Sequence, residues 1–224
     1  MPKHLQRDLE HLKKELLSMG AMVEEAINKS ILALVERRQK LAQEVMEGDM
    51  KINQKENQVE EECLKILALH QPVATDLRFI IVVLKVNNDL ERMGDLAANI
   101  AERSLYLSTH GALRISLDFP QMIEAVRIMV RDSLDALVNQ DSQLARTVIS
   151  RDDIVDGINR KMYASLQDLM KQEPASIKCA VQTLSSSRHL ERIADLTTNI
   201  AEDVVFMVEG ELIRHSFEPI TDTA

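Results

Sequence analysis

Residues 88–102 read NDLERMGDLAANIAE, and residues 188–202 read RHLERIADLTTNIAE, one hundred positions later. Nine of the fifteen aligned positions carry the same residue. A repeat on this scale predicts two copies of one structural unit, each roughly half of the 224 residues. Apolar members of the repeat are assigned to packing, so the polar members are where function is sought. They are Glu91, Asp95, Asn99 and Glu102, with Glu191, Asp195, Asn199 and Glu202 as counterparts.

The composition predicts an all-helical protein. Aromatic residues make up only 3%, Trp is absent, and the chain holds 6 Gly and 5 Pro. Sheets normally draw on aromatic and β-branched residues, whereas Leu, Ala, Glu, Met and Lys favour helix. The net charge of −9 argues against a nucleic-acid partner, because a phosphate backbone requires a basic face.

The remaining composition signals predict a soluble, cytoplasmic protein. Cys63 and Cys179 lie far apart and form no CxxC pair, so we expect buried thiols in a reducing compartment. No run of eighteen apolar residues exists to span a membrane. The amino terminus is charged and amphipathic rather than signal-like.

Apolar spacing and helix breakers predict six helices. Pro72 and Pro174 each end a helix, and Thr75 or Asp76 is expected to cap the third one. The predicted helices cover about 4–37, 39–70, 75–108, 120–140, 142–172 and 175–212. This predicts an elongated all-α fold of two tandem three-helix bundles. The predicted boundaries are 1–108 for the first bundle, 109–119 for a linker, 120–213 for the second bundle and 214–224 for a tail.

The repeated acidic residues share one helix face. At 100° per residue, the polar members of the first copy fall within about 80°, opposite the main apolar stripe. Acidic residues opposite a core are commonly just a solvated face. However, Glu91 and Asp95 repel each other at i,i+4, as do Glu191 and Asp195, and both copies keep this unfavourable pair. Small residues, such as Gly94, flank the pair and leave room for a close neighbour.

The neighbouring helix of each predicted hairpin supplies a second pair. A turn near 71–72 places position 91 opposite about 52 and position 95 opposite about 48, where Asp49 and Asn53 lie. A turn near 174 brings Asp152, Asp153 and Asp156 opposite the second acidic pair. Four carboxylates or amides on adjoining helices form an all-oxygen site suited to a hard cation. Water-bridged carboxylates without a metal remain the alternative.

Other reaction centres are excluded by inspection. No histidine follows a glutamate by three positions, as a di-iron bundle site requires, and no phosphate loop, nucleophile elbow or HExxH motif occurs. His189 is expected to be a surface residue rather than a ligand. Arg92 and Arg192, beside the acidic pairs, are expected to form salt bridges on their own helices.

The two repeats, the HQPVATDLRFI segment at 70–80 and the D-x-x-x-N/D pairs at 49–53 and 152–156 resemble the PhoU family. The resemblance covers nearly the whole chain. It implies two tandem three-helix bundles and a regulatory, non-enzymatic role in phosphate uptake and phosphate-starvation signalling. The metal motifs that it implies are Asp49 and Asn53 with Glu91 and Asp95, and Asp152 and Asp156 with Glu191 and Asp195. Asn99, Asn199, Asp153, Glu102 and Glu202 are further candidate ligands.

The resemblance also implies partners and cofactors. The expected cofactors are metal ions with oxygen ligands: iron, manganese or magnesium, with zinc as a further option. The expected partners are the phosphate ABC transporter ATPase and a sensor histidine kinase at the cytoplasmic membrane face, and the expected assembly is a homodimer. Two rival functions are a metal-independent helical scaffold and a phosphoester hydrolase that uses carboxylate-bound metal. Asn53, which replaces an expected acid, predicts a weaker first site.

Overall fold

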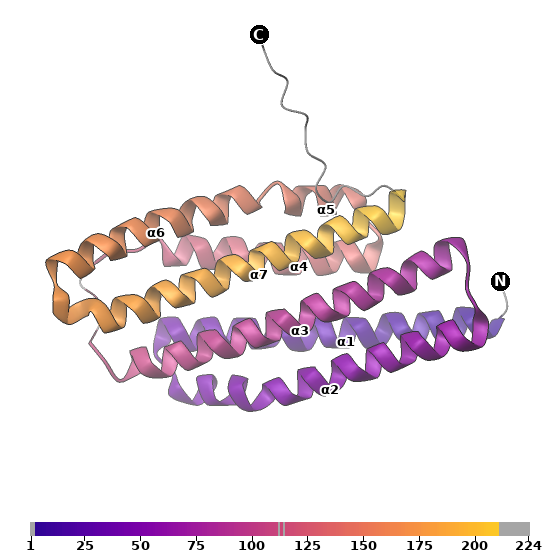
Figure 1. Cartoon of the computed structure of the whole chain (residues 1–224), viewed down its shortest axis with the longest axis horizontal. Helices are drawn as coiled ribbons and strands as arrows, with labels where there is room; N and C mark the ends of the chain where they lie inside the picture. Colours follow the sequence, from indigo (N-terminus) through magenta and orange to yellow (C-terminus); the bar gives the residue numbers. More distant parts are fainter. Residues whose placement is uncertain (1–2, 112, 114, 211–224) are drawn as a thin grey trace, which may run out of the picture.

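The computed structural model describes residues 3–111, 113 and 115–210, and it is an elongated assembly of long helices (Figure 1). The first half contains α1 (Lys3–Glu36), α2 (Gln39–His70) and α3 (Ala74–Ser108). The second half contains α4 (Phe119–Asn139), α5 (Ser142–Ile149), α6 (Asp152–Gln172), the 3₁₀ turn η1 (Pro174–Ser176) and α7 (Ile177–Glu209). No strand occurs among the described residues, which confirms the all-α prediction. The predicted tail, 214–224, lies outside them.

One predicted helix and one predicted helix cap are wrong. The helix expected over 142–172 is interrupted at Ser150 and Arg151, which separate α5 from α6. Asp141 starts α5 by accepting hydrogen bonds from the backbone of Gln143 and Leu144, and Arg151 pairs with Asp132 of α4. This ion pair holds the interruption against the neighbouring helix. Neither Thr75 nor Asp76 caps α3, which begins at Ala74 after an extended Val73.

The core follows the predicted apolar stripes and is continuous through both halves. Leu12, Met19 and Ile27 of α1 are almost fully buried, as are Met122 and Met129 of α4. These side chains belong to one cluster that reaches α3 and α7 as well. The two bundles therefore share an apolar interior, and burial of this surface is the main stabilising contribution.

The two repeat-bearing helices, α3 and α7, pack against each other and run in opposite directions through the middle of the molecule (Figure 1). Lys85 of α3 lies 2.9 Å from the Asp203 carboxylate of α7, which is almost completely buried. The same lysine lies 5.6 Å from the centre of the Phe206 ring. This contact joins the two bundles at their shared seam.

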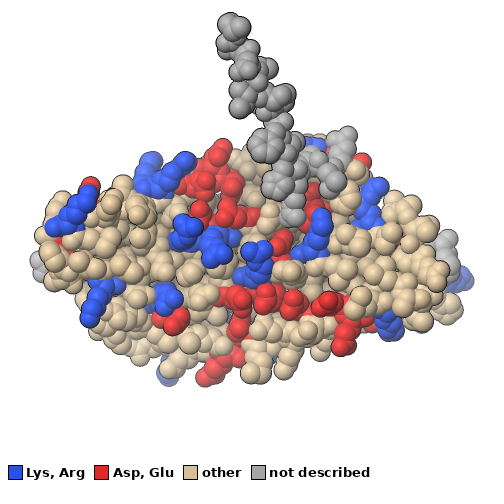
Figure 2. Space-filling model, in the orientation of Figure 1, with Lys and Arg blue, Asp and Glu red and all other residues tan. Residues whose placement is uncertain are grey.

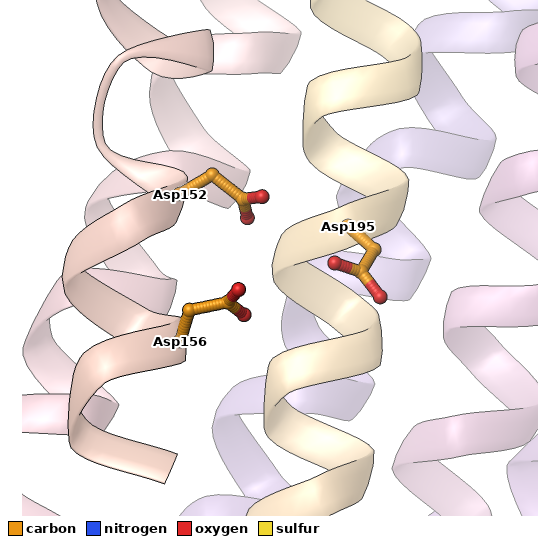
Figure 3. Close-up of side chains that lie close together, drawn as sticks. All are labelled: Asp152, Asp156 and Asp195. Carbon is orange, nitrogen blue, oxygen red and sulfur yellow. The ribbon is translucent and has the colours of Figure 1, made fainter. Parts of the chain in front are cut away.

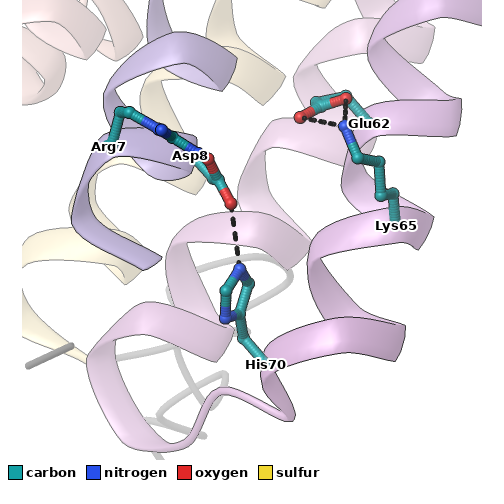
Figure 4. A network of polar contacts seen from close by, with 5 residues as sticks. All are labelled: Arg7, Asp8, Glu62, Lys65 and His70. Carbon is teal, nitrogen blue, oxygen red and sulfur yellow. Dashed lines mark hydrogen bonds and ion pairs between the residues drawn. The ribbon is translucent and has the colours of Figure 1, made fainter. Parts of the chain in front are cut away.

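Polar contacts also hold the far end of the first bundle together (Figure 4). His70, the last residue of α2, lies 2.9 Å from the Asp8 carboxylate of α1, and Arg7 contacts the same carboxylate. The hydrogen bond with His70 is the main reason why the pKa of Asp8 lies below its ordinary value. Lys65 pairs with Glu62 one turn away along α2.

Among the described helices, none is both long and apolar enough to cross a membrane.

Candidate metal centre

Three carboxylates meet where α6 lies beside α7 (Figure 3). One oxygen from each of Asp152, Asp156 and Asp195 lies within 4.8 Å of the other two. Asp152 and Asp156 are one turn apart on α6, and Asp195 points toward them from α7. Two unit charges about 4 Å apart repel by about 1 kcal/mol even in bulk water, and by more where solvent is restricted. The cluster is therefore unfavourable while all three groups are ionised and no cation is bound.

The electrostatics of this second cluster reflect that repulsion. Partial burial, followed by the charges of Asp195 and Asp156, raises the pKa of Asp152 from 3.8 to about 6. Burial and Asp195 also raise the pKa of Glu191, although Arg188 opposes the shift. Burial and Asp156 raise the pKa of Asp195. Three candidate ligands therefore bind protons more tightly than isolated carboxyl groups do.

A related cluster lies between α2 and α3. Burial and the charge of Asp95 raise the pKa of Asp49, while burial, Asp95 and Glu56 raise the pKa of Glu91. Asn53 stands one turn after Asp49, in the position that Asp156 occupies relative to Asp152. Among the described residues, no group of three acidic side chains here meets the spacing found in the second cluster. The amide at position 53 supplies the missing oxygen without a charge.

Both clusters contain buried oxygens with unused bonding capacity. One carboxylate oxygen of Asp49, the Asn53 amide oxygen and one carboxylate oxygen of Asp152 are buried and accept no hydrogen bond from the described residues. Buried polar atoms without a partner are uncommon because each costs about 1–3 kcal/mol. Such oxygens beside clustered carboxylates fit a hard cation, which prefers oxygen ligands. The donor set therefore agrees with magnesium, manganese or iron better than with zinc, which commonly takes nitrogen or sulfur ligands.

The predicted hairpin registers explain why these positions meet. Asn87 of α3 donates a hydrogen bond of 3.0 Å to the backbone carbonyl of Glu56, a pair that matches the predicted register of the first hairpin. Ser187 of α7 donates one of 3.0 Å to the Asn159 side chain, close to the register predicted for the second. Gly94 permits a close approach, because a Cβ atom there would lie 3.1 Å from the Ile52 side chain of α2.

Sequence reasoning missed Glu56. Burial, with the charges of Glu60 and Asp95, raises the pKa of Glu56. The charge of Glu56 in turn raises the pKa of Glu91, so Glu56 belongs to the first cluster. The sequence spacing could have indicated Glu56, because this residue lies one turn beyond Asn53 and directly opposite Asn87 in the hairpin register. It makes up part of the charge that Asn53 lacks.

The further candidate ligands have different surroundings. Asn99 donates to the backbone carbonyl of Asp95 at 2.9 Å, and Glu102 pairs with Arg103 at 3.2 Å. Asp153 is exposed and adds its negative charge to the surroundings of Asp152. The remaining two, Asn199 and Glu202, line a surface hollow with Lys85 of α3. Asp153 is therefore near enough to influence the second cluster by its charge but is not one of the three carboxylates that meet there, and Glu102 pairs with a cation instead.

The expectations for two basic residues near the clusters, Arg92 and His189, have different outcomes. Arg92 lies 3.8 Å from Asp89 on the same helix, as expected for a salt bridge. The expectation of a surface position for His189 is wrong, since both ring nitrogens are buried and neither has a hydrogen-bond partner among the described residues. Burial, followed by the charges of Arg103 and Arg192, lowers the pKa of His189. The α3–α7 packing that covers this ring is not visible in a single-helix pattern.

The fold and the site define a class: all-helical proteins built from two repeated three-helix units, each with an acidic cluster on its last hairpin. The family model described as the PhoU domain matches twice, over residues 16–104 and 119–204. The chain therefore belongs to the PhoU family, and the resemblance seen in the sequence is confirmed.

Individual relatives agree over nearly the whole chain. The phosphate-specific transport system accessory protein PhoU homologue of Pseudomonas putida is 40% identical, with 93% of this chain and 82% of that protein aligned. The Aquifex aeolicus homologue is 39% identical, with 93% and 95% aligned. The crystal structure of PhoU from Pseudomonas aeruginosa superposes with a TM-score of 0.90 at 37% identity, covering 92% of this chain and 99% of that one.

Proposed function

We propose that this chain is a non-enzymatic accessory protein of phosphate-specific transport that restrains phosphate uptake and phosphate-starvation signalling. Its role depends on cations bound at the two acidic clusters. It acts by contact, with the transporter ATPase and a sensor histidine kinase as the partners. The names of its relatives support the transport role, and the family match extends over both halves.

One observation carries the cation-binding part of the proposal. Three carboxylates from two helices converge within 4.8 Å, and one buried oxygen of Asp152 accepts no hydrogen bond from the described residues. A surface that only needed solubility would spread such charges apart. A di- or trivalent cation would reverse the sign of the interaction and use the free oxygen. The chain's own contribution is to hold the oxygens together on two rigid helices.

Paired variants test cation binding in each half separately. E191A/D195A should abolish binding in the second half and spare the first, and E91A/D95A should do the reverse. Isothermal titration with Mn²⁺, after removal of metal by a chelator, measures both. Because a ligand that binds only the folded state stabilises it by about 2.7 kcal/mol at one hundred times its Kd, the wild type should also melt several degrees higher with Mn²⁺.

The same thermal melts distinguish the cation-binding proposal from a metal-independent scaffold. If the clusters only repel, both double variants should equal or exceed the wild type in stability, and a chelator should change none of the three melting temperatures. That result would remove support for the cation-binding part.

The regulatory part is tested in cells: deletion of the gene should raise phosphate-starvation gene expression in phosphate-rich medium, and unchanged expression would contradict it. The homodimer and the cytoplasmic location stay predictions.

A further inference from the structure

A hollow of about 440 Å³ opens between α3 and α7, where the two copies of the repeat face each other. Every residue that lines it has its repeat partner there too. The polar lining consists of Arg92 and Arg192, Asp95 and Asp195, and Asn99 and Asn199, and two leucines complete the lining. The lining thus has approximate two-fold symmetry, which the antiparallel packing of α3 and α7 creates.

The two arginines have guanidinium groups that can reach a ligand. Arg92 is 54% exposed, and its ion pair with Asp89 is long at 3.8 Å. Arg192 is exposed as well. Space-filling atoms show basic side chains in the centre of this face, along the seam of α3 and α7, with acidic side chains on either side of them (Figure 2). The acidic clusters lie where α3 meets α2 and where α7 meets α6, whereas Arg92 and Arg192 line the hollow between α3 and α7.

The charge in the hollow depends on what the acidic clusters hold. Two arginines and two aspartates balance when no cation is bound. Asp95 and Asp195 each belong also to an acidic cluster, so a cation in a cluster offsets the charge of its aspartate. The positive charge of the two arginines then exceeds the remaining negative charge of the lining, although Asp89 still offsets part of the Arg92 charge, and the hollow attracts an anion.

We infer that the hollow between Arg92 and Arg192 is a binding site for a phosphate-type oxyanion, and that this site becomes competent when the two acidic clusters hold cations. The inference rests on the proposed function, because it needs the cations. A tetrahedral oxyanion presents acceptor oxygens to two guanidinium groups from opposite sides at once, whereas a monocarboxylate offers one edge. The Asn99 and Asn199 amides add two neutral side chains with N–H donors to the same lining.

Such a site would couple phosphate to cation occupancy. If cations strengthen anion binding, the anion must strengthen cation binding by the same factor. A protein with this coupling responds to phosphate itself, in addition to contacts with its partners. Since the hollow opens to solvent, the phosphate group of a larger molecule has access as well, and the test must separate free phosphate from a phosphate ester.

Equilibrium dialysis with inorganic phosphate tests the inference on the full chain, with and without Mn²⁺. We expect phosphate to bind about tenfold or more tightly to the Mn²⁺-loaded protein, within the usual range of such coupling. R92Q/R192Q should lose this binding while its Mn²⁺ affinity stays equal or rises, because two positive charges are removed. R7Q/R131Q, which changes the net charge equally at exposed arginines away from the hollow, should bind phosphate like the wild type.

Each remaining outcome has one meaning. Phosphate binding that ignores Mn²⁺, or that survives in R92Q/R192Q, overturns the inference, and so does loss of Mn²⁺ from that variant. Acetate, a monocarboxylate, binding as tightly as phosphate would overturn the oxyanion class. AMP in place of inorganic phosphate distinguishes an ester from the free ion: tighter AMP binding that R92Q/R192Q abolishes would support the site and assign it to the ester. A wild type that takes up no Mn²⁺ at all shows instead, from metal content alone, that the proposed function has failed and the inference with it.

Discussion

The two acidic clusters occupy equivalent places in the repeat but differ in charge. In the first, Asp49 and Asn53 lie within the long, uninterrupted helix α2. In the second, Asp152 and Asp156 lie in the first turns of α6, just after the helical interruption that separates α5 from α6. Only the second brings three carboxylates within 4.8 Å among the described residues. The shared frame places the same positions together in both halves, and we expect single residues to set how strongly each cluster attracts a cation.

Exchanging the residues that differ should produce the largest effect. D156N would make the second cluster resemble the first, and we expect it to weaken Mn²⁺ binding there roughly tenfold or more, about 1.4 kcal/mol, because one ligand charge is lost. N53D should strengthen the first cluster by a similar factor. Titration calorimetry measures each change separately when E91A/D95A or E191A/D195A disables the other cluster. Equal affinities before and after the exchange would show that Asn53 does not cause the difference.

In the metal-free protein, the pH dependence of folding stability should reveal the charge repulsion in the second cluster. Partial burial and the neighbouring carboxylates raise the pKa of Asp152 from its ordinary value of 3.8 to about 6, so the folded state binds its proton more tightly than the unfolded state does. The resulting stabilisation is fully present below pH 3.8 and is lost as the pH rises through about 6. A shift of this size corresponds to about 3 kcal/mol, which solvent screening of a partly exposed group reduces to about 1 kcal/mol.

D152N should therefore stabilise the metal-free protein at pH 7 by about 1 kcal/mol and leave it little changed at pH 4. Urea unfolding at both pH values, in the presence of a chelator, measures the difference from wild type. D153N provides a graded comparison and should give a smaller gain, because Asp153 is exposed and its charge contributes less to the raised pKa of Asp152 than the charges of Asp195 and Asp156 do. If D152N lowers stability at pH 7, the charge repulsion in the cluster is not the controlling factor.

The smallest effect concerns the packing beneath the first cluster. Gly94 has Ala194 as its counterpart, and a Cβ at position 94 would lie 3.1 and 3.2 Å from two Ile52 carbons. G94A gains about 1 kcal/mol of helix propensity, while overpacking costs about 1–3 kcal/mol. Because the Ile52 side chain has to move by only a few tenths of an ångström, we expect a cost near the lower end and a net loss below about 1 kcal/mol. The double variant I52V/G94A should recover part of that loss, because valine lacks the Cδ1 atom. If the changes in melting temperature of I52V and G94A simply add in the double variant, a direct clash between the two side chains is contradicted.

Most of the frame could be predicted from the sequence because it depends on local patterns. Apolar spacing identified the helices, and Pro72 and Pro174 marked two hairpins whose register brought the acidic pairs together. The break at Ser150 was missed, although Ser150 followed by Asp152 and Asp153 is a recognisable start signal for a helix. The apolar pattern continues through that break, so a helix was extended across it.

By itself, the sequence determined a repeated helical unit and the two pairs of polar residues in each copy, because a helix places residues four apart on one face whatever surrounds it. The tertiary structure alone decided how the copies meet. Packing of α3 on α7 buries the His189 ring nitrogens, joins Lys85 to Asp203 and brings Arg92 and Arg192 to one hollow. These contacts join residues about a hundred positions apart, and they depend on how two helix surfaces fit, which no periodicity along one helix encodes.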